Sequence, residues 1–151
     1  MKNLILLVLL FSFSATTYSC AQTKATQKEK FQSTYNSVKS NVKSKAYKFI
    51  GEVVYSNKDR TLLEGDNNEI TIAKNEASGF IKALVSSKNV DVSGVIENYL
   101  VSYDDDKQQI SIKFEIKNDE FYIDIKPNGN AFLTFKSGTD YITQVGKIEK
   151  L

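Results

Sequence analysis

The side chains of this chain that could do chemistry are almost all carboxylates and tyrosines. The sequence contains no histidine, and its only cysteine is Cys20. Sites that pair a serine or cysteine nucleophile with histidine are therefore excluded, as are zinc sites built on imidazole. The seven glycines are scattered singly and form no phosphate-binding loop. From this composition we predict a protein that is not an enzyme, with no catalytic residues and no cofactor.

The acidic run Asp104-Asp105-Asp106 is the densest group of possible metal ligands. Ca²⁺ prefers several oxygen ligands, and Asp104 and Asp106 fall at the first and third positions of a calcium-binding loop. The sixth position of such a loop requires glycine, but it is Gln109 here. We therefore predict no metal site and interpret the run as a solvated hairpin tip whose charge discourages aggregation between sheet edges.

One arginine and four tyrosines are the candidates for ligand binding. Arg60, the only arginine, follows Asn57-Lys58-Asp59 in a predicted turn, where it is either a solvated charge or a clamp for an anionic ligand. Tyrosines on neighbouring strands would form a binding surface if their registers align, although strand propensity alone also predicts tyrosine at half-buried positions. The four candidates are Tyr99, Tyr103, Tyr122 and Tyr141.

Residues 1–20 have the pattern of a signal peptide. Lys2 supplies the positive start, residues 4–13 form an apolar stretch, and small residues precede position 20. Because a membrane-spanning helix takes about 20 apolar residues, this stretch and all later ones are too short to cross a bilayer. We expect an exported protein of the periplasm or outer membrane, with no transmembrane helix.

Two processing routes are open for this leader. The segment Thr17-Tyr18-Ser19-Cys20 resembles a bacterial lipobox, in which cleavage before the cysteine leaves its thiol to carry a lipid. The alternative is ordinary secretory cleavage after Ala21. Because the only cysteine of the chain falls at the cleavage point, we favour Cys20 as a lipidation site that anchors the protein to a membrane. Either route leaves a mature domain without a disulfide.

Charge divides the mature chain into a basic arm and an acidic domain. Residues 21–48 hold seven lysines against Glu29, whereas residues 49–151 have a net charge of −5. This acidic domain argues against a nucleic-acid ligand. Within the arm, apolar residues at spacings of 4, 3 and 4 predict a helix over 28–44 that docks on the domain or, alternatively, binds a membrane surface or a partner. They are Phe31, Tyr35, Val38 and Val42. Residues 21–27 are predicted to be a flexible tether.

Residues from Tyr47 onward follow the period of two that is typical of strands. Short connections require antiparallel neighbours, so we predict a mainly β domain over 28–151: a meander of eight or nine strands forming a barrel or a sandwich, with the helix at one opening or edge. Asn128-Gly129 predicts a type I′ hairpin turn. The predicted strands are 47–56, 69–73, 79–85, 90–96, 98–104, 108–117, 120–126, 130–136 and 140–148.

The second half of the chain resembles a family of exported Bacteroidetes proteins known as domain of unknown function 4251 (DUF4251). The resemblance covers roughly residues 44–151 and implies a leader, an N-terminal helix and a β-rich domain, but no activity or ligand. An aromatic-proline segment of the family is replaced here by residues 79–85. The family has an arginine and a tyrosine in its final strand; in this chain no basic residue near Thr139 matches the arginine, and Val145 stands in place of the tyrosine. The resemblance rests on residues 92–99, 110–116, 129–135, 141–142 and 146–148.

Three functions remain open at this stage. We favour a non-catalytic module of the cell envelope that binds an unknown protein or small ligand through its β surface. A barrel that carries a small apolar ligand is the second, and it requires an internal cavity above about 300 Å³. A carboxylate-based hydrolase is the third, and it requires two acidic side chains about 5–9.5 Å apart in a concave site.

Overall fold

The computed structural model describes residues 19–55, 59–64, 68–83, 89–138 and 140–151. The predicted leader up to residue 18 lies outside this description, and side chains are described from Gln27 onward, so Cys20 is described only as backbone. The predicted division into leader, tether and domain stays a prediction.

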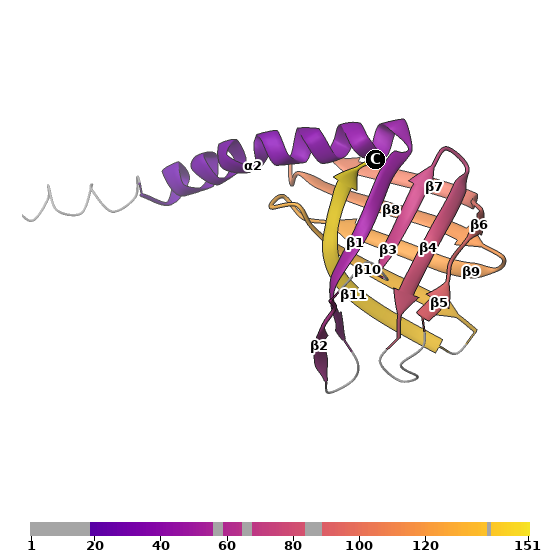
Figure 1. Ribbon diagram of the computed structural model, residues 1–151. Helices are drawn as coiled ribbons and strands as arrows, with labels where there is room; N and C mark the ends of the chain where they lie inside the picture. The colour runs from indigo at the N-terminus through magenta and orange to yellow at the C-terminus, as the bar shows by residue number, and fades with distance from the viewer. Residues whose placement is uncertain (1–18, 56–58, 65–67, 84–88, 139) are drawn as a thin grey trace, which may run out of the picture.

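A single antiparallel sheet makes up most of the described chain (Figure 1). Nine of its strands follow one another in the order β5-β4-β3-β1-β11-β10-β9-β8-β7, while β2 pairs with β1 and β6 pairs with β4. The bounds are β1 (Ala46–Tyr55), β2 (Arg60–Leu62), β3 (Glu69–Ala73), β4 (Glu76–Lys82), β5 (Asn89–Asp91), β6 (Gly94–Val95), β7 (Glu97–Asp104), β8 (Gln109–Ile116), β9 (Asp119–Ile125), β10 (Asn130–Ser137) and β11 (Asp140–Lys150).

The prediction of a mainly β domain with one N-terminal helix is confirmed, and the sheet takes the form of a half-barrel. It curls without closing, so neither a closed barrel nor two packed sheets results (Figure 1). Two details of the strand prediction were wrong. The predicted strand 90–96 is divided into β5 and β6, because Val92 turns inward and its N–H donates to Gly79. Strand β2 was not predicted, since its three exposed residues show no alternation.

The turn chemistry also differs from the expectation. Asn128-Gly129 does not form a type I′ turn, which would need positive φ at both residues. Only Gly129 has positive φ, and its N–H donates to Lys126 at 2.9 Å around Pro127, which gives a turn closed by a glycine bulge. Positive φ at two successive residues occurs instead at Lys117 and Asn118, between β8 and β9. Asparagine tolerates this conformation better than most residues, which explains how the turn forms without glycine.

Curvature is concentrated where β1 crosses β11. Gly51 pairs with Gly146, and the register shifts by one residue between Gly51 and Val53. A Cβ atom added to Gly146 would lie 2.7 Å from the Ile50 carbonyl carbon and closer still to its oxygen. The two backbones therefore approach more closely than any side chain permits, and the bulge adds local twist to β1.

The concave face of the sheet holds the core. Inward residues alternate along each long strand, as in β8, where Ile110, Ile112, Phe114 and Ile116 are buried. The Phe114 and Phe121 rings stack in parallel at 4.8 Å, and Phe135 packs next to them. These side chains fill the interior of the half-barrel.

Helix α2 (Ser19–Ser44) crosses the open side of this core (Figure 1). It begins earlier than the residue 28 expected from the apolar spacing, and it runs through residues 21–27. Its Tyr35, Val38 and Val42 side chains are buried in the core, so the expectation that the stripe docks on the domain is confirmed. Within the described part of the chain, no helix is long and apolar enough to cross a membrane.

Substitution of Gly146 by alanine should destabilise the protein by about 3 kcal/mol, because the new Cβ overlaps the backbone of β1 and forces the two central strands apart. Urea unfolding followed by circular dichroism measures this loss. Gly138→Ala is the control: nothing lies within 4 Å of its added Cβ, so only its left-handed backbone costs about 1 kcal/mol. Equal losses in the two variants would show that the close approach is unimportant.

Candidate binding site between the helix and two turns

The β7–β8 turn, residues 104–108, contacts the side of α2 through hydrogen bonds. We call it the acidic turn. The Tyr35 hydroxyl donates to Asp105 at 2.6 Å, and the Lys39 ammonium also bonds to this carboxylate. Gln108 is 3% exposed, and its amide donates to the Lys28 carbonyl at 3.0 Å and to Gln32 Oε1 at 2.8 Å. Asp105 is exposed, as expected of a solvated tip, and it also joins the strands to the helix.

Hydrogen bonds favour the ionised forms of two carboxyl groups of this turn, Asp104 and Asp105. Bonds from Lys39 and Tyr35 lower the pKa of Asp105, and bonds from the backbone and side chain of Lys107 lower the pKa of Asp104. Burial and the bond to Asp105 raise the pKa of Tyr35 far above its usual value. Asp106 lies 3.6 Å from Lys28 Nζ. Asp104 and Asp106 thus face lysines, and in the described ranges no three acidic, cysteine or histidine side chains are grouped as metal ligands.

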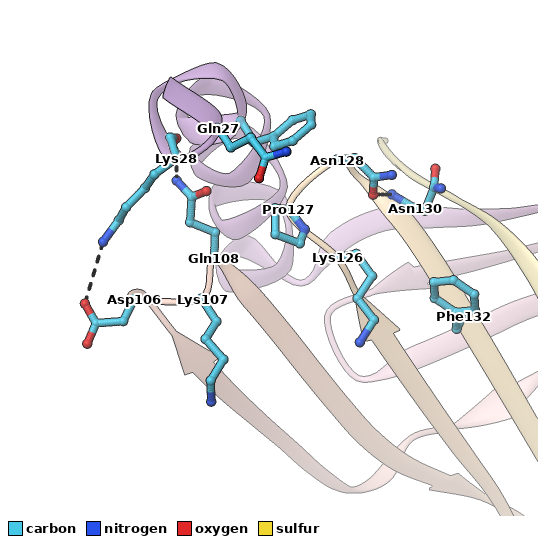
Figure 2. A pocket seen from close by; sticks show the side chains of 11 residues that line it. Gln27, Lys28, Asp106, Lys107, Gln108, Lys126, Pro127, Asn128, Asn130 and Phe132 are labelled. Atoms are coloured by element: carbon cyan, nitrogen blue, oxygen red, sulfur yellow. Dashed lines mark hydrogen bonds and ion pairs between the residues drawn. The ribbon is translucent and has the colours of Figure 1, made fainter. Parts of the chain in front are cut away.

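A pocket of about 450 Å³ lies beside these contacts, between α2, the acidic turn and the β9–β10 turn (Figure 2). Its apolar surface comes from Phe31 on the helix, Pro127 in the turn and Phe132 on β10. Phe132 stands opposite Asp124 and Val145 and alternates with the buried Ala131 and Leu133, so it lies on the outer face of the sheet. The remaining lining residues are Gln27, Lys28, Asp106, Lys107, Gln108, Lys126, Asn128 and Asn130.

The pocket carries a positive formal charge, since three lysines and one aspartate line it. Lys28 and Lys107 are partly neutralised by Asp106 and Asp104. Lys126 forms no ion pair with any residue that the structure describes, and Figure 2 shows it between the acidic turn and Phe132. Of the three pocket lysines, Lys126 is therefore the one without an ionic partner in the described part of the chain.

The four candidate tyrosines do not form one surface. Tyr99 and Tyr103 pack against the core: the hydroxyls of Tyr99 and Tyr47 lie 3.2 Å apart, and Lys39 and Lys43 lie over the Tyr103 ring. Burial raises the pKa of both tyrosines. Tyr122 and Tyr141 lie on the outer face, where they pair with Thr134 and Lys136. The residues were correctly placed in strands, but the two pairs point to opposite faces.

Arg60 and the carboxylates also lie apart from the pocket. Arg60 is exposed at the start of β2, opposite Tyr55, while residues 57 and 58 of its predicted turn lie outside the described chain. Glu115 and Glu120 face each other across β8 and β9, but Glu115 accepts from Asn98 at 2.7 Å and Glu120 accepts from Tyr122 at 2.6 Å. The bond from Tyr122 lowers the pKa of Glu120.

Every described carboxyl group whose pKa is clearly shifted has a lowered pKa, and hydrogen bonds are the main cause of each shift. A glycosidase-like site needs one carboxyl held protonated as a general acid next to a second one. Asp106 is the single acid among the described residues that line the pocket.

Several pocket residues were not singled out from the sequence. The sequence pattern could have identified Phe132, because a large aromatic residue between Ala131 and Leu133 falls at a solvent-facing position of an alternating strand. Pro127, the only proline, marked the adjoining turn. No sequence pattern identifies Gln108 or Lys126, since their roles depend on how two distant turns meet the helix.

Comparison with solved structures shows the fold of the chain. A crystal structure of a DUF4251 family protein from Bacteroides eggerthii matches with a TM-score of 0.67 and 14% sequence identity, over 77% of this chain and 87% of that chain. The chain therefore has the fold of a DUF4251 protein, and the resemblance identified in the sequence is confirmed at this level. No family model and no curated protein matches the chain.

Asp105→Asn should lower the melting temperature at pH 7, because it removes the charge that bonds to Tyr35 and Lys39. The folded state lowers the pKa of Asp105 below its usual 3.8, so its contribution is present above that pH and is lost as pH falls through the folded value. The two proteins should therefore melt alike near pH 2, well below the usual carboxyl range. Circular dichroism melts test this, with Asp59→Asn, an exposed aspartate next to β2, as the control. A difference that persists unchanged at pH 2 would contradict the role of the charge.

Proposed function

We propose that this protein is a non-catalytic module of the cell envelope that binds a partner or small ligand through its β domain, at the pocket between α2, the acidic turn and the β9–β10 turn. The observation that carries the proposal is the pocket itself, whose volume of about 450 Å³ falls within the usual range of ligand sites. It combines apolar walls with a few polar groups that converge from three separate segments, which is the usual composition of such sites.

A non-catalytic role is supported by the chemistry of the chain. The sequence has no histidine, and the pocket holds one carboxylate among amides, lysines and apolar side chains. Acid–base and nucleophilic catalysis need a group whose proton affinity is tuned to its task. The groups of the pocket suit recognition better than bond cleavage.

The structure favours an outer site over an apolar ligand inside the half-barrel. Stacked aromatic rings and branched aliphatic side chains fill the concave face, and α2 adds three more buried side chains. The pocket lies instead outside this core, between α2 and two turns, and only its Phe132 wall belongs to the outer face of the sheet. An apolar ligand in the interior would have to displace this core.

Export and a lipid anchor at Cys20 form the second half of the proposal. They are supported by the leader pattern and by the position of the only cysteine at its end. Helix α2 begins at Ser19, so it leads from the proposed anchor to the pocket. An anchored protein would therefore hold the pocket close to the membrane that carries it.

Replacement of Cys20 by serine should release the protein from the membrane fraction, because the serine hydroxyl cannot take the thioether-linked lipid. The native protein should fractionate with membranes and have an intact mass that includes the lipid, whereas C20S should be soluble. Cell fractionation and intact-mass spectrometry of the full-length protein measure both. A native protein that is soluble at its unmodified mass would refute the anchor.

Phe132→Ala should reduce capture of the native partner or ligand by the immobilised domain, because it removes one apolar wall of the pocket. The variant should stay folded, since the Phe132 side chain is partly exposed on the outer face. Tyr141→Ala is the matched control, as an aromatic of the same face outside the pocket. Quantitative mass spectrometry of material bound from envelope extract should show molecules lost with F132A and retained with Y141A; equal capture by both would contradict the site.

A further inference from the structure

We propose that the ligand of the pocket is an acidic sugar, a pyranose ring that bears a carboxylate or a phosphate. The inference rests on the proposed binding role of the pocket and adds the chemical class of the ligand. Three kinds of group line the pocket, and each matches a different part of such a molecule.

The charge of the ligand follows from Lys126. Lys28 and Lys107 already face aspartates, at 3.6 Å and 3.0 Å, whereas Lys126 has no ionic partner among the described residues. Asp106 is turned toward Lys28 (Figure 2). A cationic ligand would meet an excess of lysines, and a neutral ligand would gain nothing from the charge of the exposed Lys126. An anionic group next to Lys126 gains a charge-assisted hydrogen bond.

The apolar walls of the pocket indicate that the ligand contains a ring. Phe31, Pro127 and Phe132 come from three separate segments and line the same pocket. The C–H face of a pyranose is apolar and flat, so it can pack against an aromatic ring without leaving a polar group unpaired. These walls are discontinuous and alternate with polar groups, which suits a ring with polar edges better than a long acyl chain.

The amide side chains of the pocket indicate a ligand that carries hydroxyl groups. Gln27, Asn128 and Asn130 line the pocket with groups that can both donate and accept hydrogen bonds. Asn128 Oδ1 accepts from the Asn130 N–H at 3.1 Å, which fixes the side chain with its NH₂ group left to donate. The Gln108 amide already donates to the helix, so it positions the wall of the pocket. A sugar offers the several hydroxyls that three amides can bind, whereas a lipid phosphate alone does not.

The experiment is a titration of the purified mature protein, followed by NMR or calorimetry, with glucuronate, glucose 6-phosphate and glucose as probes. At least one of the two acidic sugars should bind about tenfold more tightly than glucose, the change expected for one charge-assisted hydrogen bond. Lys126→Gln should remove this difference. Lys150→Gln, which removes the same charge from an exposed position at the end of β11, should leave it unchanged.

Vesicles of phosphatidylcholine with phosphatidylglycerol form a second arm that separates a soluble sugar from a lipid headgroup. Binding to these vesicles without binding to either acidic sugar would overturn the inference in favour of a lipid headgroup. Equal affinity for glucose and the acidic sugars, or equal loss in K126Q and K150Q, would also overturn it. If none of the probes binds but F132A still loses captured material, the ligand class is wrong while the binding role of the pocket stands.

Discussion

The packing of one helix across an unclosed sheet determines most of this structure. A sheet that curls without closing leaves its apolar concave face open on one side, and the hydrophobic effect requires that face to be covered. Tyr35, Val38 and Val42 cover it, and burial of each contributes about 1.5–3 kcal/mol. The chain holds no cysteine beyond residue 20, so no disulfide within the chain adds to this packing.

The same packing creates the candidate site. The helix extends beyond its buried stripe, and its flank meets the acidic turn and the β9–β10 turn (Figures 1 and 2). Aspartates of the acidic turn neutralise lysines of the helix and of the turn itself. Lys126 belongs to neither and keeps its charge for a ligand. Three lysines of the basic arm, Lys28, Lys39 and Lys48, thus form ion pairs with carboxylates of the acidic domain.

Local patterns predicted the fold well, because its strands and helix are determined by local chemistry. Alternation in 110–116 gave β8, and the spacing of Tyr35, Val38 and Val42 gave the docked face of α2. Two outcomes differed from the prediction. Asn128-Gly129 adopts a bulged turn because the adjacent Pro127 fixes its own φ. Tyr99 and Tyr103 belong to the inward residues of their strand, whereas Tyr122 and Tyr141 alternate with buried residues and point outward. The pocket could not be predicted, since its walls are far apart in the chain.

The position of the last strand has a consequence for how the chain reaches its native state. β11 lies between β1 and β10, so it is the strand that joins the half of the sheet built from β1–β6 to the half built from β7–β10. Neither half can be joined to the other until residues 140–150 are available, and contacts between the two ends of a chain form slowly. The sheet therefore stays in two separate halves, each with an unpaired edge, until β11 has been synthesised and has paired with both.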